Sequence, residues 1–282
     1  MSFLSHPVKV AAAFFTSPLS KGFAVVALAL GLVGCAAPAV EHGDVGEDLA
    51  GTEAAVTARE TALSGATAKL FATPPSTLPW QPFVLPGKRY VVFEPVAVLA
   101  RPSLRVKADN SVSILRRRFE PTVLAPGRLA FSWKVDALPL AADLAAADAA
   151  DSPVRIVLGF EGDRSRWTPK MHRLSEMSRL LTGEELPYAT LIYVWGNKEA
   201  PGTVVVNPRT DRIRKLVLDS GTSQLGLWRD HVRDVQADFR QAFGEEPGPL
   251  RVVALMTDTD NTRSALTAWY GALTLENAAP AR

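Results

Sequence analysis

A polar run near the C-terminus carries the oxygen-bearing side chains best suited to chemistry in this chain. Asp258, Asp260 and Asn261 lie directly after the apolar run Val252–Thr257. Carboxylate and amide oxygens suit Ca²⁺, although the glycine and the distal glutamate of an EF-hand are missing. The alternative is that these side chains cap turns and accept backbone hydrogen bonds. The run is therefore a candidate ligand-binding loop, with Asp258 and Asp260 as candidate calcium ligands.

Aromatic residues on two β-prone runs form a second candidate set. Trp195 and Asn197 end one run, and Trp269 and Tyr270 lie in the run Ala268–Leu275. Exposed aromatic rings flanked by Asp and Asn can stack on sugar rings while the polar groups bond the hydroxyls. The alternative is that the rings fill the protein core. The sequence thus predicts either a glycan site formed by these residues and the aspartate loop or a core built from the same rings.

Catalytic motifs do not accompany these residues. The sequence contains no GxSxG and no HExxH, and Cys35 is its single cysteine. Carboxylate pairs such as Asp258 with Asp260 keep a saccharide hydrolase or lyase open as an alternative. A scaffold that binds another envelope protein is a further alternative, which a large exposed apolar patch would favour. We assign no catalytic residue and favour a binding function.

The elements that position these residues are predicted to be short strands. From Trp80 onward, runs rich in Val, Leu and aromatics are separated by Pro, Gly, Asn and Asp. Apolar and polar residues alternate within them, as expected for strands with one buried face. We expect a hairpin from the last two runs, and the absence of βαβ alternation favours an antiparallel two-sheet sandwich. The expected strands are 89–94, 104–108, 111–119, 129–135, 154–160, 190–195, 203–206, 213–218, 228–232, 252–257 and 268–275.

Two short helices are predicted beside the strands. Met171–Leu181 places apolar residues three and four positions apart, and Gly183 follows as a stop signal. Val235–Phe243 has the same period and ends at Gly244. Both are expected at the periphery of the sandwich.

The N-terminus has the composition of a bacterial export signal. Residues 1–34 contain Lys9 and Lys21, no acidic residue, and the apolar run Phe23–Val33, which is too short for a permanent span. The tetrapeptide Leu-Val-Gly-Cys that ends at Cys35 resembles the lipobox of bacterial lipoproteins. This resemblance implies cleavage before Cys35, acylation of its thiol and, because no aspartate follows, sorting to the outer membrane. The expected partner is the membrane, through a lipid anchor facing the periplasm or the cell surface.

The chain that follows the predicted signal has a balanced charge, and its composition changes near residue 75. Two of the 31 Lys and Arg leave with the signal and none of the 29 Asp and Glu do, so the mature chain balances 29 against 29. This balance argues against a nucleic-acid partner. Residues 35–75 are rich in Ala, Gly, Thr and Glu and predict a flexible tether, with an alanine-rich helix over Glu47–Leu70 as the alternative. Residues 76–282 are the expected β-sandwich domain.

Several tracts together resemble a known bacterial family. They are FSWKVDALP (131–139), LPYATLIYVWGN (186–197), VVVNPRTDRIRKLVLDSG (204–221), WRDHVRDVQADFRQAFGEEP (228–247) and ALMTDTDNT with AWYG (254–271). In this combination the chain is similar to the domain of unknown function 3047 family over about Trp80–Glu276. The resemblance implies a jelly-roll-like β-sandwich, similar in outline to carbohydrate-binding modules, in a secreted or envelope protein. It implies no cofactor and no established activity.

Overall fold

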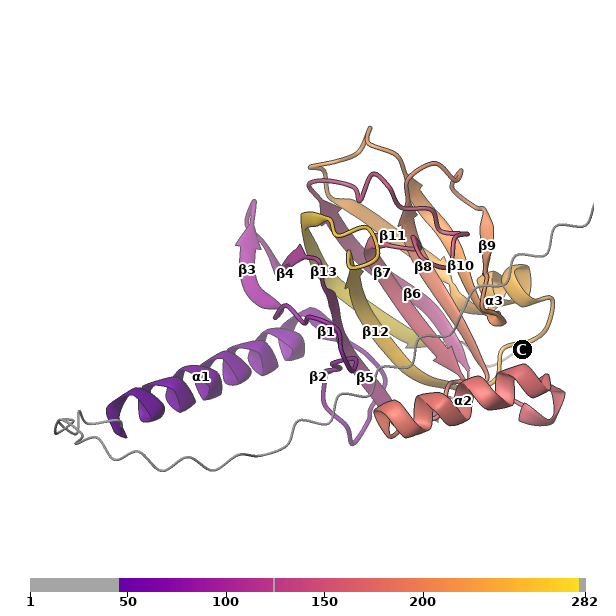
Figure 1. The fold of residues 1–282 in the computed structure, drawn as a ribbon, viewed down its shortest axis with the longest axis horizontal. Coiled ribbons are helices and arrows are strands. Elements are labelled where there is room, and N and C mark those ends of the chain that lie inside the picture. Colours follow the sequence, from indigo (N-terminus) through magenta and orange to yellow (C-terminus); the bar gives the residue numbers. More distant parts are fainter. Residues whose placement is uncertain (1–45, 124, 279–282) are drawn as a thin grey trace, which may run out of the picture. The chain divides into compact units, whose positions relative to one another are not determined.

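The computed structural model describes residues 46–123 and 125–278, and these form a predominantly antiparallel β-sandwich (Figure 1). Cys35 and the predicted signal lie outside the described residues. The described part belongs to one compact unit, Gly46–Arg282. Among the helices within it, none is both long enough and apolar enough to cross a bilayer.

The first of the two sheets, sheet A, has the strand order β11-β6-β13-β4-β3, and β1 also pairs with β13 in parallel. Its neighbours on the main path are antiparallel. The bounds of its strands are β1 (Phe71–Ala72), β3 (Glu94–Val98), β4 (Arg101–Asp109), β6 (Pro126–Val135), β11 (Arg229–Asp234) and β13 (Ala265–Asn277).

The second sheet, sheet B, has the order β2-β5-β12-β7-β8-β10-β9. Only β8 and β10 run parallel in it. Its strands are β2 (Gln81–Pro82), β5 (Val112–Val123), β7 (Ser152–Phe160), β8 (Ala189–Gly196), β9 (Val204–Asn207), β10 (Thr210–Ser220) and β12 (Leu250–Asp258). The predicted two-sheet sandwich is confirmed.

Two sequence expectations about strands are wrong. The last two strands do not form a hairpin, because β12 pairs with β5 and β7 whereas β13 pairs with β4 and β6. Their connection therefore crosses from sheet B to sheet A. The expected strand over 89–94 is irregular up to Phe93, since this segment carries the chain from β2 in sheet B to β3 in sheet A.

Both expected helices are present: the helix over 235–243 has the expected bounds, and the other begins two residues before and ends one residue after the expected range 171–181. Helix α2 (Pro169–Thr182) begins after Thr168, whose hydroxyl accepts a hydrogen bond from the Met171 amide. Helix α3 (Val235–Phe243) begins after Asp234, which accepts from two backbone amides. Gly183 and Gly244 end these helices in the left-handed conformation that glycine adopts without strain. Helix η1 (Arg164–Arg166) is a single 3₁₀ turn.

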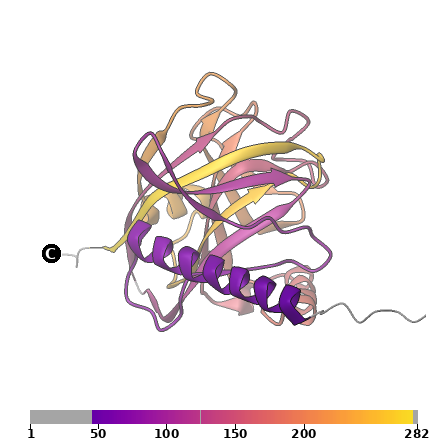
Figure 2. The same ribbon diagram turned by 90° about the vertical axis from the view of Figure 1, so that its left-hand side faces the viewer.

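A third helix, α1 (Gly46–Leu70), occupies most of the predicted tether and corresponds to the helical alternative for that segment. Its C-terminal half packs on the sandwich. Leu63 and Ala66 pack against the main core, and Leu70 is itself part of the core. Figure 2 shows this helix in front of the strands.

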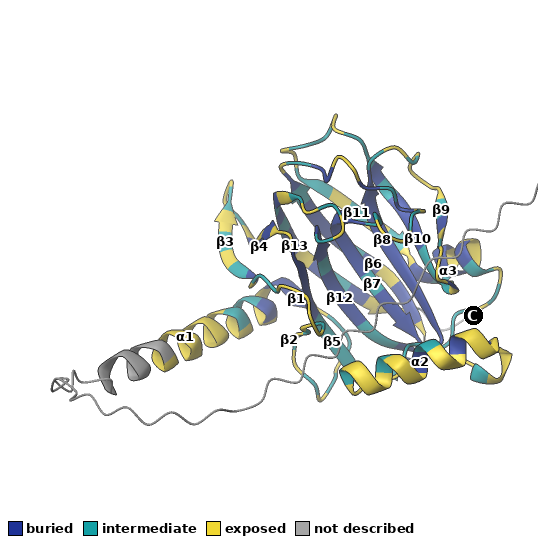
Figure 3. Cartoon of the chain, viewed as in Figure 1, coloured by how far each residue is buried: buried dark blue, intermediate teal, exposed yellow. Residues whose placement is uncertain are grey.

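The core lies between the two sheets and is dominated by aromatic rings. Inward-facing residues of sheet A meet those of sheet B, with Phe131 and Tyr193 stacked at 5.8 Å. Figure 3 shows burial concentrated in the strands, whereas most of α2 is exposed. The largest fully buried aromatic side chains are Trp133, Phe160, Tyr193, Trp195, Phe239 and Tyr270.

Packing of α3 against this core can be tested by Phe239→Ala. The Phe239 ring is fully buried and lies 4.7 Å from the Phe160 ring. We expect the substitution to lower the free energy of unfolding by about 3–5 kcal/mol, because it removes buried apolar area and leaves a cavity. Urea unfolding measures this change. Leu180→Ala on α2 is the control, since Leu180 is 78% exposed and its truncation should change stability by less than about 0.5 kcal/mol. Equal losses in both variants would contradict the packing.

Candidate functional site

Two of the aromatic candidates lie in the core rather than on a surface. Trp195 is fully buried, and its indole N–H donates to the Gly221 carbonyl at 3.0 Å. Tyr270 is 1% exposed, and its hydroxyl pairs with Thr257 and donates to the Met256 carbonyl. Neither ring is accessible for stacking on a ligand.

Asn197 is a structural anchor in this fold. Its side-chain amide donates to the backbone carbonyls of Pro139 at 2.7 Å and Ala142 at 3.2 Å. These bonds hold the alanine-rich connection between β6 and β7 against the end of β8. The donors that a glycan would need are therefore already in use.

The aspartates of the candidate loop do converge, together with a third carboxylate. Asp258 is the last residue of β12, and Asp260 follows in the loop from β12 to β13, which we call the crossing loop. Asp151 directly precedes β7, the neighbour of β12 in sheet B. Oxygen atoms from the three side chains lie within 4.8 Å of one another. Asp151 is 1% exposed and Asp258 8%, so the cluster is buried.

Cations of the same chain neutralise this aspartate cluster (Asp151, Asp258 and Asp260). Arg155 Nη1 lies 2.8 Å from Asp258 Oδ2, and Lys88 pairs with Asp260. Burial raises the pKa of Asp258 to about 6; Asp151 and Asp260 add to the rise while Arg155 opposes it. Burial also lowers the pKa of Lys215 to about 8, and Arg155 contributes to that shift.

The clearest task of the cluster is to hold the crossing loop. Asp151 accepts hydrogen bonds from the amides of Asn261 and Thr262, at 3.4 Å and 2.8 Å, and from the Thr262 hydroxyl at 2.6 Å. Asn261 thus contributes its backbone amide to this hydrogen bonding, and Asn261 itself is exposed. A calcium ion at Asp258 and Asp260 would have to compete with Arg155 and Lys88. Calcium binding stays a prediction that the contacts do not favour.

A different surface holds the remaining candidate, Trp269. Ala268 and Tyr270 on either side of it face the core, so Trp269 projects from the outer face of sheet A. Trp228, directly before β11, lies on the same face. One atom of its ring is 3.4 Å from where a Cβ on Gly271 would stand, so the missing side chain of Gly271 permits this close approach. Both indoles are partly exposed.

A groove of about 610 Å³ lies on sheet A next to Trp228, with Lys69 and Leu70 of α1 on one side; it shares Arg101 with the surroundings of the Trp228 ring, and neither indole lines it. Its floor includes the small residues Ala130, Ser132, Ala272 and Thr274. Charged residues line its edge: Arg101 pairs with Asp230 at 2.8 Å, and the Arg101 guanidinium lies 4.9 Å from the centre of the Trp228 ring. We name this surface, with Trp228, Trp269 and the groove, the sheet A face.

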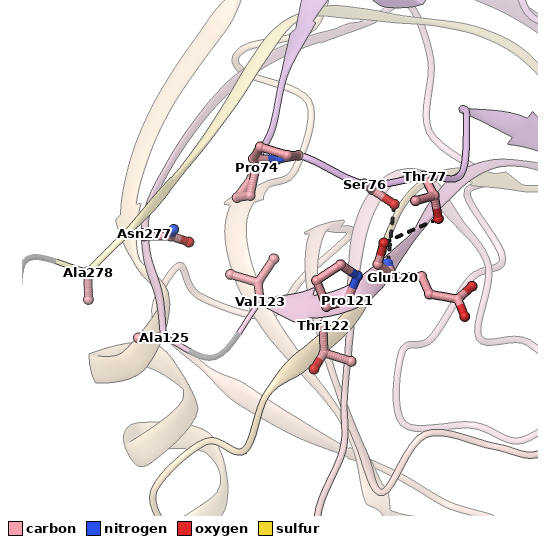
Figure 4. Close-up of a pocket in the computed structure, with 11 residues that line it drawn as sticks. Pro74, Ser76, Thr77, Glu120, Pro121, Thr122, Val123, Ala125, Asn277 and Ala278 are labelled. Carbon is pink, nitrogen blue, oxygen red and sulfur yellow. Dashed lines mark hydrogen bonds between the residues drawn. The ribbon is translucent and has the colours of Figure 1, made fainter.

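Another cavity offers less chemistry. It measures about 810 Å³ and lies where residues 74–77 meet the end of β5 (Figure 4). Its polar groups bond to one another: Ser76 accepts from the Glu120 amide, and Thr77 donates to the Glu120 carbonyl. Three prolines contribute to the lining. Among the residues that the structure describes, Glu120 is the only titratable one in its lining.

Sequence reasoning missed Asp151, Arg155 and Trp228. Asp151 and Arg155 lie more than 100 positions before Asp258, and only the pairing of β7 with β12 brings them together. The sequence pattern around Trp228 indicates its position only weakly: Trp228 begins the run 228–232, and its alternate residues Asp230 and Val232 are exposed in the structure. Alternation along β11 would have placed Trp228 on the outer face.

Comparisons with known proteins identify the family of the chain. The chain matches the family described as "Protein of unknown function (DUF3047)" over residues 78–274. None of the curated proteins compared with the chain matches it.

Among solved structures, the chain shows a distant similarity to two glycanases. One is the xyloglucanase domain of NopAA from Sinorhizobium fredii, in complex with cellobiose, with 10% identity, 72% of this chain and 100% of that chain covered, and a TM-score of 0.37. Another is the family 11 xylanase from Neocallimastix patriciarum, with 12% identity, 66% and 86% covered, and a TM-score of 0.31. Likeness at this level carries no functional argument.

The charge state of the aspartate cluster can be tested through the pH dependence of stability. Because the pKa of Asp258 is higher in the folded chain, about 6, than the usual value near 3.9, folding favours the proton. The contribution to stability is therefore fully present below about pH 4 and is lost as the pH rises through 6. Between pH 4 and 7 we expect wild type to lose on the order of 2 kcal/mol relative to Asp258→Asn, measured by urea unfolding.

The control for this measurement is Asp109→Asn. Asp109 is an exposed carboxylate paired with Arg89 on the surface, so its removal should leave the pH profile of wild type unchanged. Parallel profiles for wild type and Asp258→Asn would show that Asp258 is ionised throughout this range.

Proposed function

Since the chain belongs to the DUF3047 family of proteins of unknown function, its role has to be argued from its surfaces, and we propose that it binds a carbohydrate on the sheet A face without catalysis. The observation that carries this proposal is the presence of two partly exposed tryptophans on one solvent-facing sheet surface beside a shallow groove. Flat aromatic surfaces stack on the apolar faces of sugar rings.

The position of the rings supports an extended ligand. Trp228 lies over Gly271, which is two residues from Trp269 along β13. The two indoles therefore project from the sheet close to each other. The groove continues from there over Ala272 and Thr274. A ligand with several sugar units could contact both rings and the groove at once.

The charges on this surface favour an acidic glycan. Lys134 Nζ lies 5.1 Å from the centre of the Trp269 ring. Arg105 is the cross-strand neighbour of Trp269 and pairs with Glu94 at 2.6 Å. Exposed ion pairs contribute little stability and exchange partners readily. Uronate or other acidic groups on a glycan would therefore find Lys134 and the arginines available beside the aromatic rings.

The carboxylates of the chain support binding rather than hydrolysis. The aspartate cluster has oxygens within 4.8 Å, which approaches the spacing of retaining glycosidases. However, Asp151 and Asp258 are buried, and the cluster is neutralised by Arg155 and Lys88. A sugar could not reach between these side chains. We propose no catalytic residue.

Attachment to the cell envelope completes the proposal. We propose that the chain is exported, cleaved before Cys35 and acylated there, so that the β-sandwich is held at the outer membrane. The support is in the sequence: Lys9 and Lys21, the apolar run 23–33, and the small residues before Cys35. A tethered binding domain would then meet envelope or surface glycans at high local concentration.

Glycan binding can be tested with polygalacturonate and its fully methyl-esterified form, which differ in charge but share a sugar backbone. Affinity electrophoresis of the full chain should show retardation by polygalacturonate, weakened about tenfold in Trp269→Ala because a stacking platform is lost. Leu180→Ala, on the exposed side of α2, should bind as wild type does.

Two outcomes would contradict parts of this proposal. Equal retardation by the esterified polymer would remove the acidic specificity while keeping glycan binding. Unchanged binding in Trp269→Ala and in Trp228→Ala would remove the sheet A face as the site.

Envelope attachment can be tested by Cys35→Ser. We expect wild type in the outer-membrane fraction with a mass increase from acyl chains, and the variant without this increase and released from the membrane, because the thiol that carries the lipid is missing. Mass spectrometry and membrane fractionation measure both. Unacylated wild type in the soluble fraction would contradict the proposal.

A further inference from the structure

A second pocket lies under helix α1 and is separate from the sheet A face. It has a volume of about 400 Å³ and is enclosed between the middle of α1 and residues 90–95. This segment is the irregular connection that passes from sheet B to sheet A. Helix α1, which Figure 2 shows in front of the strands, supplies one wall of the pocket.

The lining of this α1 pocket is mostly hydrocarbon. Val56 and Leu63 line it from the helix, and Pro82, Val92 and Phe93 from the opposite wall. Val56 is 49% and Val92 48% exposed, so apolar side chains meet solvent at its opening. Covering these surfaces with an apolar ligand would be favourable.

One polar group in the wall of the pocket has no partner. The Tyr90 hydroxyl is buried, and no other described residue accepts or donates a hydrogen bond to it. The hydroxyls of Tyr193 and Tyr270, by contrast, are each hydrogen-bonded. Burial raises the pKa of Tyr90 to about 12, so its hydroxyl keeps its proton at neutral pH and can donate. A buried donor without an acceptor is unfavourable unless a ligand supplies one.

A positive charge stands at the same pocket. Arg59 lines it from α1 and is exposed, and within the described part of the chain its guanidinium has neither an ion pair nor a hydrogen bond. Two carboxylates line the pocket as well: Glu94, which is already paired with Arg105, and Glu60, which follows Arg59 on the helix and is exposed like it. The lining therefore suits a ligand with an apolar body and an oxygen that accepts a hydrogen bond, and Arg59 is the cation that can pair with an acidic head group at the opening.

We propose that the α1 pocket binds one fatty acid chain, with its hydrocarbon between α1 and residues 90–95. Arg59 pairs with the carboxylate, and the Tyr90 hydroxyl donates to a ligand oxygen. The volume lies near the lower end of the range for small-molecule sites, about 300–1,000 Å³, which suits one acyl chain rather than two. This function is independent of glycan binding on the sheet A face.

The proposal can be tested by titrating laurate into the full chain and measuring heat by isothermal titration calorimetry. All samples carry Cys35→Ser, so that no acyl group attached to the chain itself can fill the pocket. Wild type should bind one laurate per chain. Tyr90→Phe should bind about tenfold more weakly, because only the hydrogen-bond donor is lost.

A pair of matched substitutions separates occupation of the pocket from general surface binding. Val56→Trp places a large ring at the pocket and should abolish binding. Val206→Trp, on edge strand β9, introduces the same ring at a residue of similar exposure, 45%, and should bind as wild type does. Thermal melting of ligand-free Tyr90→Phe should give an unchanged or higher Tm, because an unpaired buried hydroxyl is removed.

Three results would overturn the inference. They are no laurate binding by wild type, equal binding by Val56→Trp and Val206→Trp, or unchanged laurate affinity in Tyr90→Phe. Dodecanol binding as tightly as laurate would remove the role of Arg59. Binding only to phosphatidylglycerol vesicles, with none to soluble laurate, would show a membrane surface in place of a fatty acid site.

Discussion

Face-to-face packing of the two sheets is the constraint on which the rest of this structure depends. Side chains alternate along each strand, so packing one face of each sheet removes every second residue from solvent. In β13 this places Ala268 and Tyr270 in the core and leaves Trp269 outside. In β8 it buries Trp195 completely. Which aromatic rings a ligand can reach is therefore decided by the packing and not by the ring chemistry.

Buried polar groups fix how the sheets meet. Asp219 of sheet B accepts hydrogen bonds from the Trp133 indole at 2.7 Å and from Arg229, and it lies 2.8 Å from His231, all in or beside sheet A. Burial alone would raise the pKa of Asp219, but the bonds from His231 and Trp133 outweigh it and lower that pKa. Asp219 is thus an ionised clamp between the sheets. A chain without a disulfide in its described domain gains specific alignment from such contacts.

The chain is least regular where it passes between the sheets, and the α1 pocket lies at one of these crossings. In the crossing from β12 to β13, Asp151 accepts hydrogen bonds from the amide and the hydroxyl of Thr262, so the carboxylate cluster holds this loop in place. The crossing from β2 to β3 has no such anchor. It leaves Tyr90 unpaired and an apolar pocket beneath α1. The flat outer face of sheet A, between regular strands, instead offers an extended surface with Trp228 and Trp269.

The sequence by itself determined the elements and the class of fold. Alternation of apolar and polar residues reports local backbone geometry, so ten of the eleven expected strands match strands of the structure, while the expected strand 89–94 meets β3 only at Glu94. Helices α2 and α3 end at the expected glycines. The tertiary structure decided which strands are neighbours. The apparent hairpin of β12 and β13 divides between two sheets because hydrogen-bond pairing joins residues far apart in the chain.

The same physical reason separates the residues that sequence could identify from those it could not. Asp258, Asp260 and Trp269 are conspicuous in their own segments. Whether an aspartate meets Asp151 and Arg155, or a tryptophan meets solvent, depends on contacts made more than 100 residues away. Such contacts leave no local pattern in the sequence. Only the folded chain, by bringing distant strands into register, decided which of these side chains support the fold and which remain free to bind.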